Sequence, residues 1–173
     1  YGFEKSFINR IGNENITKKN ILILGSGGVT PSIIYALNKI NVKKIFVTNR
    51  TLQNAENIKK KFPLVEIITW ENFFQRTEEM DIIINATSLG MKSGFDFETL
   101  IQKYKPSLIY YDIIYNPLET KMIKNFKEKK VKTFNGLEMF LFQAQKSFSL
   151  WRKITPIIDE EIKEKITLSL KKK

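Results

Sequence analysis

A cluster of glycines between an apolar run and a helix-like segment is the first feature of the sequence that indicates chemistry. The stretch ILILGSGGVTP, residues 21–31, contains Gly25, Gly27 and Gly28. Gly25 would allow a tight turn and Gly27 a close approach of pyrophosphate, whose charge would face free N–H groups in the first turn of the next helix. The stretch therefore predicts a dinucleotide-binding loop over Gly25, Ser26, Gly27, Gly28 and Val29.

This loop departs from the usual fingerprint at its third small residue. Thr30 stands where glycine or alanine would let helix and strand pack closely, so we expect these two elements to lie slightly further apart. Pro31 is tolerated because N–H groups in the first turn of a helix have no intrahelical partner. The departure weakens the motif without cancelling it. A glycine turn that binds nothing is the alternative interpretation.

The residues after the next apolar strand indicate which dinucleotide binds. A site for NAD places Asp or Glu about 20 residues past the glycines, on the ribose 2′-hydroxyl, where its charge would repel a 2′-phosphate. The segment FVTNRT has Asn49, Arg50 and Thr51 in that region instead. Arg50 can pair with a phosphate and stack on adenine, while Asn49 and Thr51 can donate to phosphate oxygens. The sequence favours NADP over NAD, and Thr51 has a simple helix N-cap as its alternative role.

Apolar runs and helical patterns alternate along the chain and must position these residues. Short, almost continuously apolar strands between helices indicate a parallel sheet covered on both faces. The predicted fold is α/β, a doubly wound, mostly parallel sheet in a Rossmann-like dinucleotide-binding domain. The predicted strands are residues 21–24, 44–48, 65–69, 81–85, 108–112 and 131–134, and the predicted helices are residues 3–11, 31–40, 52–62, 118–129, 136–151 and 157–170.

Composition limits the remaining functions. The 173 residues include no cysteine and no histidine, which excludes disulfides, a metal site of thiolates or imidazoles, and an imidazole base. No apolar run reaches the roughly 18 residues of a membrane span and the start lacks a signal-peptide pattern, so we expect a soluble, cytoplasmic chain without membrane contact. The net charge of +11 raises a nucleic-acid alternative. Because the lysines are scattered over nearly every predicted helix, a solvated surface that favours anionic metabolites is the preferred interpretation.

Five segments resemble the cofactor-binding half of the shikimate dehydrogenase family. They are GSGGVTPSIIYAL, TNRT, DIIINATSLGM, YDIIYNPLETKMI and FNGLEMFLFQAQKSFSLW, and the resemblance extends from Tyr1 to about Pro156. The Asn-Ala-Thr-Ser and Tyr-Asn-Pro-x-x-Thr runs are much more specific than the glycine loop. The resemblance implies an NADP-dependent oxidoreductase that reversibly reduces 3-dehydroshikimate to shikimate, a step towards chorismate and the aromatic amino acids.

The resemblance also assigns roles around the adenosine half of the cofactor. It places residues 25–29 under the pyrophosphate and residues 49–51 at the adenosine phosphate. Family members often have a second basic residue where this chain has Asn54. The clamp on the 2′-phosphate is therefore expected to be weaker, and the preference for NADP less strict.

Three further segments would approach the nicotinamide half. Asn85 to Ser88 resembles a loop at the carboxyl edge of the sheet that passes near the nicotinamide, although Asn85 and Thr87 have a second interpretation as groups that only satisfy local backbone. Ile113 and Gly136 correspond to positions that touch the nicotinamide portion, as an apolar wall and a close approach without a side chain. Simple packing is the alternative for both.

Two residues would reach the substrate. Tyr115 in IIYNP and Gln143 in FLFQAQ match family positions that hydrogen-bond the small polyhydroxylated acid. A core position for Tyr115 and a surface position for Gln143 are the alternatives. Glu138 replaces a glycine that is usual in the family. Its carboxylate would disfavour an anionic substrate unless it points away or pairs with a lysine.

The family's first half, a substrate domain with a Ser-x-Ser carboxylate anchor and a catalytic Lys–Asp pair, has no counterpart in this sequence. We expect residues 1–16 to form a lead-in helix from this missing domain, residues 17–156 the NADP-binding domain, and residues 157–173 a C-terminal helical tail. Without the pair no proton reaches the carbonyl oxygen of the substrate. We therefore predict no catalytic residue in this chain, which would bind cofactor without turnover and meet shikimate or 3-dehydroshikimate together with the missing domain.

Several interpretations stay open. The favoured one is the NADP-binding portion of a shikimate dehydrogenase. The alternatives are a stand-alone, non-catalytic nucleotide-binding module, an NAD-using quinate or shikimate dehydrogenase relative, and a basic nucleic-acid-binding domain. The oligomeric state, including a homodimer, is also open.

Overall fold

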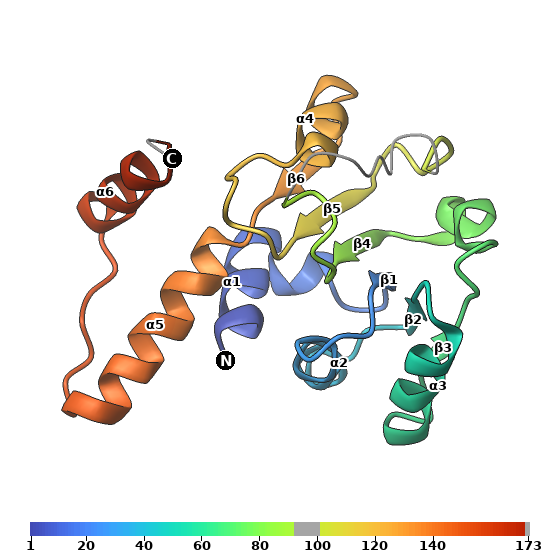
Figure 1. Cartoon of the computed structure of the whole chain (residues 1–173), viewed down its shortest axis with the longest axis horizontal. Helices are drawn as coiled ribbons and strands as arrows, with labels where there is room; N and C mark the ends of the chain where they lie inside the picture. The colour runs from blue at the N-terminus through green and yellow to red at the C-terminus, as the bar shows by residue number, and fades with distance from the viewer. Residues whose placement is uncertain (92–100, 172–173) are drawn as a thin grey trace.

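Figure 1 shows the computed structural model of the chain, in which helices lie on both sides of a central sheet. The structure describes residues 1–91 and 101–171. The sheet has the strand order β3-β2-β1-β4-β5-β6, and every neighbouring pair is parallel. The doubly wound, Rossmann-like α/β prediction is confirmed, with all of the pairing parallel rather than most of it.

The elements follow the predicted order along the chain. The strands are β1 (Asn20–Leu24), β2 (Lys44–Thr48), β3 (Glu66–Ile67), β4 (Ile82–Asn85), β5 (Ile109–Asp112) and β6 (Lys132–Phe134). The helices are α1 (Gly2–Ile11), α2 (Thr30–Lys39), α3 (Leu52–Lys61), α4 (Lys121–Glu128), α5 (Leu137–Arg152) and α6 (Glu160–Lys171), with short 3₁₀ helices η1 (Asn13–Asn15) and η2 (Phe73–Glu79).

Three predicted elements have an end that differs from the structure by two residues or more, and local contacts explain two of these differences. Helix α4 begins at Lys121 rather than residue 118 because the Thr120 hydroxyl caps it, accepting from the N–H of Ile123. Helix α6 begins at Glu160 rather than residue 157 because the Asp159 carboxylate accepts from the N–H of Ile162. Strand β3 is shorter than predicted and lies at the sheet edge, where it pairs only with β2. The 3₁₀ helix η2 was not predicted.

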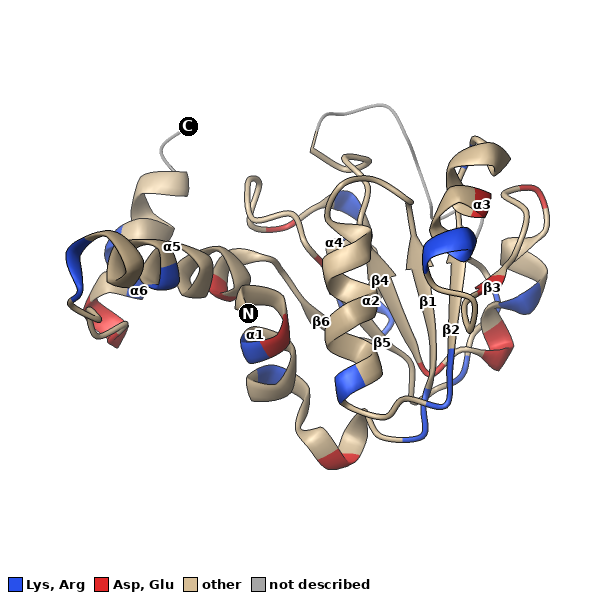
Figure 2. Ribbon diagram, turned by 90° about the horizontal axis from the view of Figure 1, so that it is seen from below, with Lys and Arg blue, Asp and Glu red and all other residues tan. Residues whose placement is uncertain are grey.

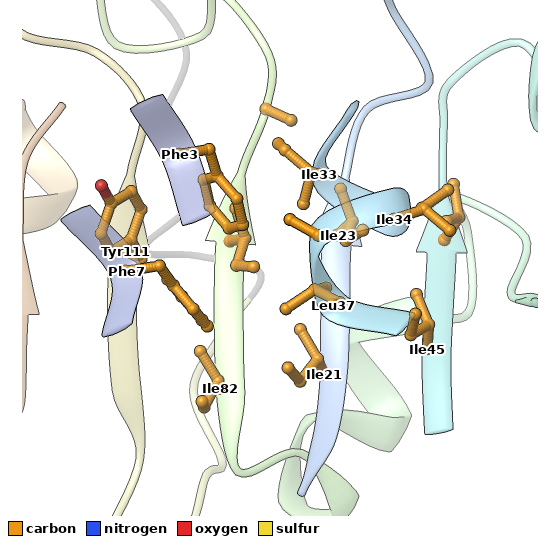
Figure 3. Close-up of a cluster of buried hydrophobic side chains, with 14 of the residues drawn as sticks. Phe3, Phe7, Ile21, Ile23, Ile33, Ile34, Leu37, Ile45, Ile82 and Tyr111 are labelled. Atoms are coloured by element: carbon orange, nitrogen blue, oxygen red, sulfur yellow. The ribbon is translucent and has the colours of Figure 1, made fainter. Parts of the chain in front are cut away.

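Alternate residues of each strand face opposite sides of the sheet and build two apolar cores. Ile21 and Ile23 of β1 belong to the core beneath α1, α2 and α3, which Figure 3 shows in close-up. Leu22 and Leu24 face the other way, into the core covered by α4 and η2. This alternation explains why the strands read as continuously apolar runs. No helix within the described ranges is long and apolar enough to cross a membrane.

Helix α1 is built into the first of these cores. Phe3 and Phe7 stack on each other and meet the ring of Tyr111 edge-on, with centroid distances of 4.8, 5.6 and 5.2 Å. The hydroxyls of Ser6 and Tyr111 lie 2.7 Å apart in a buried hydrogen bond between α1 and β5. The segment predicted as a lead-in helix therefore shares the core of the sheet, while the predicted domain boundaries themselves stay predictions.

We expect the substitution Phe7→Ala to lower the free energy of unfolding by about 3–5 kcal/mol, because it opens a cavity between α1 and the sheet. Urea denaturation followed by circular dichroism measures this. Tyr35→Ala removes an aromatic ring that is 60% exposed on α2 and should change stability by about 0.5 kcal/mol or less. Equal losses for the two variants would contradict the placement of α1.

Candidate functional site

Three segments meet at the carboxyl edge of the sheet, where ligands of open α/β folds bind. Strand β1 lies between β2 and β4, so the chain reverses its winding direction there. The glycine loop follows β1, residues 85–88 begin at the last residue of β4, and residues 113–116 follow β5. Most of the predicted site residues are thus collected at one edge from distant parts of the chain, while Gly136 and Gln143 lie at the start of α5 and within it.

The glycine loop is tightly held at its start and open at its tip. Gly25 has a φ of +104°, and a Cβ atom there would lie 2.8 Å from the methyl group of Thr87. At Gly27 and Gly28 a Cβ atom would meet nothing within 4 Å. Among the residues that the structure describes, the N–H groups of Gly27, Gly28 and Val29 have no hydrogen-bond partner. The tip therefore offers backbone donors and free space to an anion.

Thr30, the departure from the fingerprint, is fully buried. Its hydroxyl donates to the carbonyl of Gly25 at 3.0 Å, which joins the start of α2 to the loop. Pro31 lies in the first turn of α2, as expected. The threonine is thus accommodated by a hydrogen bond that glycine or alanine would not make.

Asn49 lies between the glycine loop and the start of α3. Its side-chain oxygen accepts from the N–H of Ser26 at 3.2 Å, and its side-chain nitrogen donates to the carbonyl of Thr51 at 2.9 Å. Thr51 is the N-cap residue of α3 but makes no side-chain capping bond, so the structure does not support that alternative. Asn49 therefore connects the predicted pyrophosphate loop to the predicted site of the adenosine phosphate.

The charges around this edge suit an anionic ligand. Arg50 is exposed and forms no ion pair within residues 1–91 and 101–171, and Asn54 is exposed in the first turn of α3. The first turns of α2 and α3 contain no acidic residue, so the positive ends of both helix dipoles are uncompensated. The buried hydroxyl of Ser26 also has no partner in the described part of the chain. These features fit a phosphate-bearing dinucleotide.

A polar network joins the ends of β4 and β5. The side-chain nitrogen of Asn85 donates to the carboxylate of Asp112 at 3.1 Å and to the carbonyl of Leu89 at 3.1 Å. The side-chain oxygen of Asn85 accepts from the hydroxyl and the N–H of Thr87, at 2.6 and 3.1 Å. Asn85 thus bonds to local backbone, as its alternative interpretation proposed, but it also bonds to the distant carboxylate of Asp112. Thr87 takes part in this network and also lines a pocket.

This pocket, of about 380 Å³, lies between the segments that follow β4 and β5. Of the predicted residues it brings together Thr87, Ile113 and Tyr115. The ring of Tyr115 stacks on Phe140 of α5, with centroids 4.5 Å apart. Gly136 supports the wall from behind, because a Cβ atom there would lie 1.9 Å from the carbonyl oxygen of Ile113. Packing thus explains the glycine, and contact with a nicotinamide stays a prediction.

A second pocket, of about 420 Å³, contains Val29 of the glycine loop and Gln143 of α5. The two predicted substrate residues therefore line different pockets. Glu138 faces neither pocket: its carboxylate is buried and accepts from Arg10 at 3.1 Å and Asn9 at 3.2 Å. It points away towards α1, and its cationic partner is an arginine rather than a lysine.

Comparison with known proteins decides the family. The profile of the shikimate/quinate 5-dehydrogenase family matches residues 8–140, well over half of the chain. The chain belongs to this family. It corresponds to the family's NAD(P)-binding C-terminal portion, as the sequence predicted.

Individual relatives agree with this assignment. A shikimate dehydrogenase (NADP(+)) of Pelagibacter ubique is 47% identical over 148 residues, which cover 86% of this chain and 54% of that protein. The crystal structure of shikimate dehydrogenase from Aquifex aeolicus matches with 34% identity and a TM-score of 0.76, covering 90% of this chain and 56% of that one. A shikimate 5-dehydrogenase from Listeria monocytogenes, solved with shikimate and NAD, matches with 28% identity and a TM-score of 0.78 over 95% of this chain and 62% of that one.

This member of the shikimate/quinate dehydrogenase family spans about half the length of the curated relatives it matches. Relatives are named for NADP⁺ or were solved with NAD. Figure 2 shows Lys and Arg spread from α6 at one end of the view to α3 at the other, rather than gathered on one face. Within the described ranges no group of three or more acidic residues could hold a metal ion.

Asp112 is the functional candidate that sequence analysis missed. It is fully buried at the end of β5 and accepts hydrogen bonds from Asn85, Ile114, Tyr110 and Thr120. Burial raises the pKa of the Asp112 carboxyl to about 6, although these four hydrogen bonds favour the charged form. The sequence did contain a signal for it: a single carboxylate ends the otherwise apolar strand IYYD. A charged group buried there needs hydrogen-bonding or charged partners.

We expect the stability of the chain to fall with pH through the titration of Asp112. Because the folded state holds the proton more tightly than the unfolded state, the contribution of this group is fully favourable below about pH 4 and is lost as the pH rises through 6. The difference in unfolding free energy between the natural chain and Asp112→Asn should fall by about 2 kcal/mol between pH 4 and pH 7. Urea denaturation over this range measures it, and a constant difference would contradict the raised pKa.

Proposed function

We propose that the chain is the NADP-binding portion of a shikimate dehydrogenase, an enzyme that interconverts 3-dehydroshikimate and shikimate. The observation that carries the proposal is the glycine loop, in which three N–H groups have no partner among the described residues, next to a β2 end that has Arg50 where an NAD site would have a carboxylate. Family membership supports the reaction class. The place in aromatic amino acid synthesis and the cytoplasmic location stay predictions that depend on this assignment.

The residues at the sheet edge divide the cofactor between them. Gly27, Gly28 and Val29 would donate backbone N–H groups to the pyrophosphate, and Arg50 would pair with the 2′-phosphate. The pocket lined by Thr87 and Ile113 would hold the nicotinamide, which when bound accepts or supplies the hydride. Both ends of the Asn49 amide already form hydrogen bonds, to Ser26 and to Thr51. Asn49 would therefore hold the loop in position beside the 2′-phosphate site rather than bind the phosphate itself.

The substrate would lie beyond the nicotinamide, with Tyr115 and Gln143 as hydrogen-bonding groups on this side. Tyr115 is partly exposed at its pocket, and Gln143 is exposed in the pocket beside Val29. We assign no proton-transfer role to a residue of this chain. The proposal is therefore cofactor binding without turnover by this chain alone, with catalysis in a protein of the relatives' full length.

An NAD-using relative is the competing function, favoured by Asn54 and by the Listeria enzyme solved with NAD. Calorimetric titration of the chain with NADP⁺ and NAD⁺ distinguishes the two. We expect NADP⁺ to bind at least about tenfold more tightly, a difference of roughly 1.4 kcal/mol. Equal affinities would favour the NAD-using relative, and no binding by a folded chain would refute the proposal.

Arg50→Gln should weaken NADP⁺ binding about tenfold or more and leave the affinity for NAD⁺ within about twofold, because only NADP⁺ carries the 2′-phosphate. Lys59→Gln, in the last turn of helix α3, which begins two residues after Arg50, is the matched loss of one positive charge and should change neither affinity. Asn54→Arg should tighten NADP⁺ binding several-fold by supplying a second cation. If Arg50→Gln weakens the binding of both cofactors equally, Arg50 does not recognise the 2′-phosphate.

Gly27→Ala should weaken binding of both cofactors about tenfold, because its methyl group occupies the open tip where the pyrophosphate approaches. The substitution should leave the melting temperature unchanged or slightly raised, since no atom lies within 4 Å of the new methyl and the unfolded chain loses entropy. Gly136→Ala is the contrast: it collides with the backbone of Ile113 and should lower the melting temperature. Unaltered cofactor binding by Gly27→Ala would show that the pyrophosphate does not bind at the tip of the glycine loop.

A further inference from the structure

The two walls of the pocket between β4 and β5 are both attached to one buried carboxylate. We propose that Asp112 is a positioning residue that sets the spacing of these walls for the nicotinamide half of the cofactor. The inference deepens the proposed function and rests on it. Asp112 does not itself line the pocket, so any effect on a ligand there must pass through its hydrogen-bond partners.

The first wall is attached through Asn85. Its side-chain nitrogen donates to Oδ1 of Asp112 at 3.1 Å, and its side-chain oxygen holds both the N–H and the hydroxyl of Thr87. The hydroxyl of Thr87 in turn accepts from the N–H of Leu89 at 3.0 Å. The segment that places Ala86 and Thr87 on the pocket is therefore oriented by a chain of bonds that begins at Asp112.

The second wall is attached to the same oxygen atom. The N–H of Ile114 donates to Oδ1 of Asp112 at 3.0 Å, between the pocket residues Ile113 and Tyr115. In addition, the N–H of Ile113 donates to the carbonyl of Asn85 at 3.1 Å. Both walls thus converge on Oδ1, and their separation depends on where this one atom lies.

The other carboxylate oxygen is anchored to the body of the fold. Oδ2 of Asp112 accepts from the hydroxyl of Thr120, the cap of α4, at 2.9 Å and from the hydroxyl of Tyr110 at 3.2 Å. Burial, with the charge of Asp112 in second place, raises the pKa of Tyr110 well above its ordinary value, so its hydroxyl remains a donor. One oxygen faces the pocket walls while the other is fixed by α4 and β5, which is the arrangement expected of a group that supports a binding site from behind.

A carboxylate suits this place because it accepts at both oxygens without donating. Four donors converge on Asp112, and an apolar side chain would leave them without a partner. Asparagine retains one acceptor oxygen for the two walls, and the hydroxyls of Tyr110 and Thr120 can turn to accept from its amide. Asp112→Asn should therefore preserve the walls, whereas Asp112→Ala and Asp112→Ser should release them.

The experiment compares two ligands by calorimetry at pH 8, using NADP⁺ and adenosine 2′,5′-bisphosphate, which shares the adenosine 2′-phosphate but lacks the nicotinamide. We expect the natural chain to bind NADP⁺ about tenfold more tightly than the bisphosphate. In Asp112→Ala and Asp112→Ser this ratio should fall to about one, while the bisphosphate affinity stays within about twofold. Asp112→Asn should restore the ratio. Ser6→Ala removes the buried hydrogen bond to Tyr111 on the same strand, away from the pocket, and should leave the ratio unchanged.

The outcomes separate this proposal from the proposed function. If the natural chain binds neither ligand, the proposed function fails and this proposal fails with it. If it binds both with equal affinity, the nicotinamide gains nothing from the pocket and only the present proposal is overturned. An unchanged ratio in the folded Ala and Ser variants also overturns it. The proposal is also overturned if Asp112→Ala and Asp112→Ser both fail to fold while Asp112→Asn stays native. The carboxylate would then maintain the fold rather than the positions of the pocket walls.

Discussion

The parallel pairing of β1 with both β2 and β4 is the constraint on which the rest of the structure depends. It brings the carboxyl ends of three strands to one edge, so the turn after each strand contributes to the same surface. Gly25 is then pressed between these turns: its N–H donates to the carbonyl of Thr48 at 2.8 Å, and it lies against Ala86 and Thr87. Any side chain there would separate the turns, so the pairing, the glycine and the shape of the edge depend on one another.

Different kinds of interaction are found at different positions along this edge. Backbone donors and helix dipoles near Gly27 and Gly28 provide a general attraction for anions, which many phosphates would satisfy. Arg50 adds a charge at one end, and an apolar pocket wall at Ile113 adds shape at the other. In the proposed complex, selectivity would come from features at the two ends of the edge, while the glycine loop between them would supply a general attraction for phosphate.

Much of the fold was readable from the sequence because its signals are local. Apolar runs flanked by glycine and proline identify β1, β2, β4 and β5, and the cap at Thr120 is the kind of detail that shifts a boundary by a few residues. The site was readable only as a set of positions. That Asn49 holds the glycine loop, or that Glu138 turns towards Arg10, depends on which strands become neighbours, and hydrogen bonds between residues far apart in sequence leave no periodic pattern. Asp112 was overlooked in part for the same reason, since its burial and its bond to Asn85 depend on the pairing of β4 with β5, although its other partners, Tyr110, Ile114 and Thr120, lie close to it in the sequence.

The N–H groups at the tip of the glycine loop, which no other residue in the described part of the chain engages, affect how the chain behaves in ordinary solutions. They do not distinguish the pyrophosphate of a dinucleotide from any other compact oxyanion, because a helix N-terminus responds to charge and size alone. Inorganic phosphate or sulfate would therefore occupy the loop when no dinucleotide is present and would have to leave before one enters. The affinity measured for the proposed cofactor would consequently be an apparent one that falls as the concentration of competing anions rises.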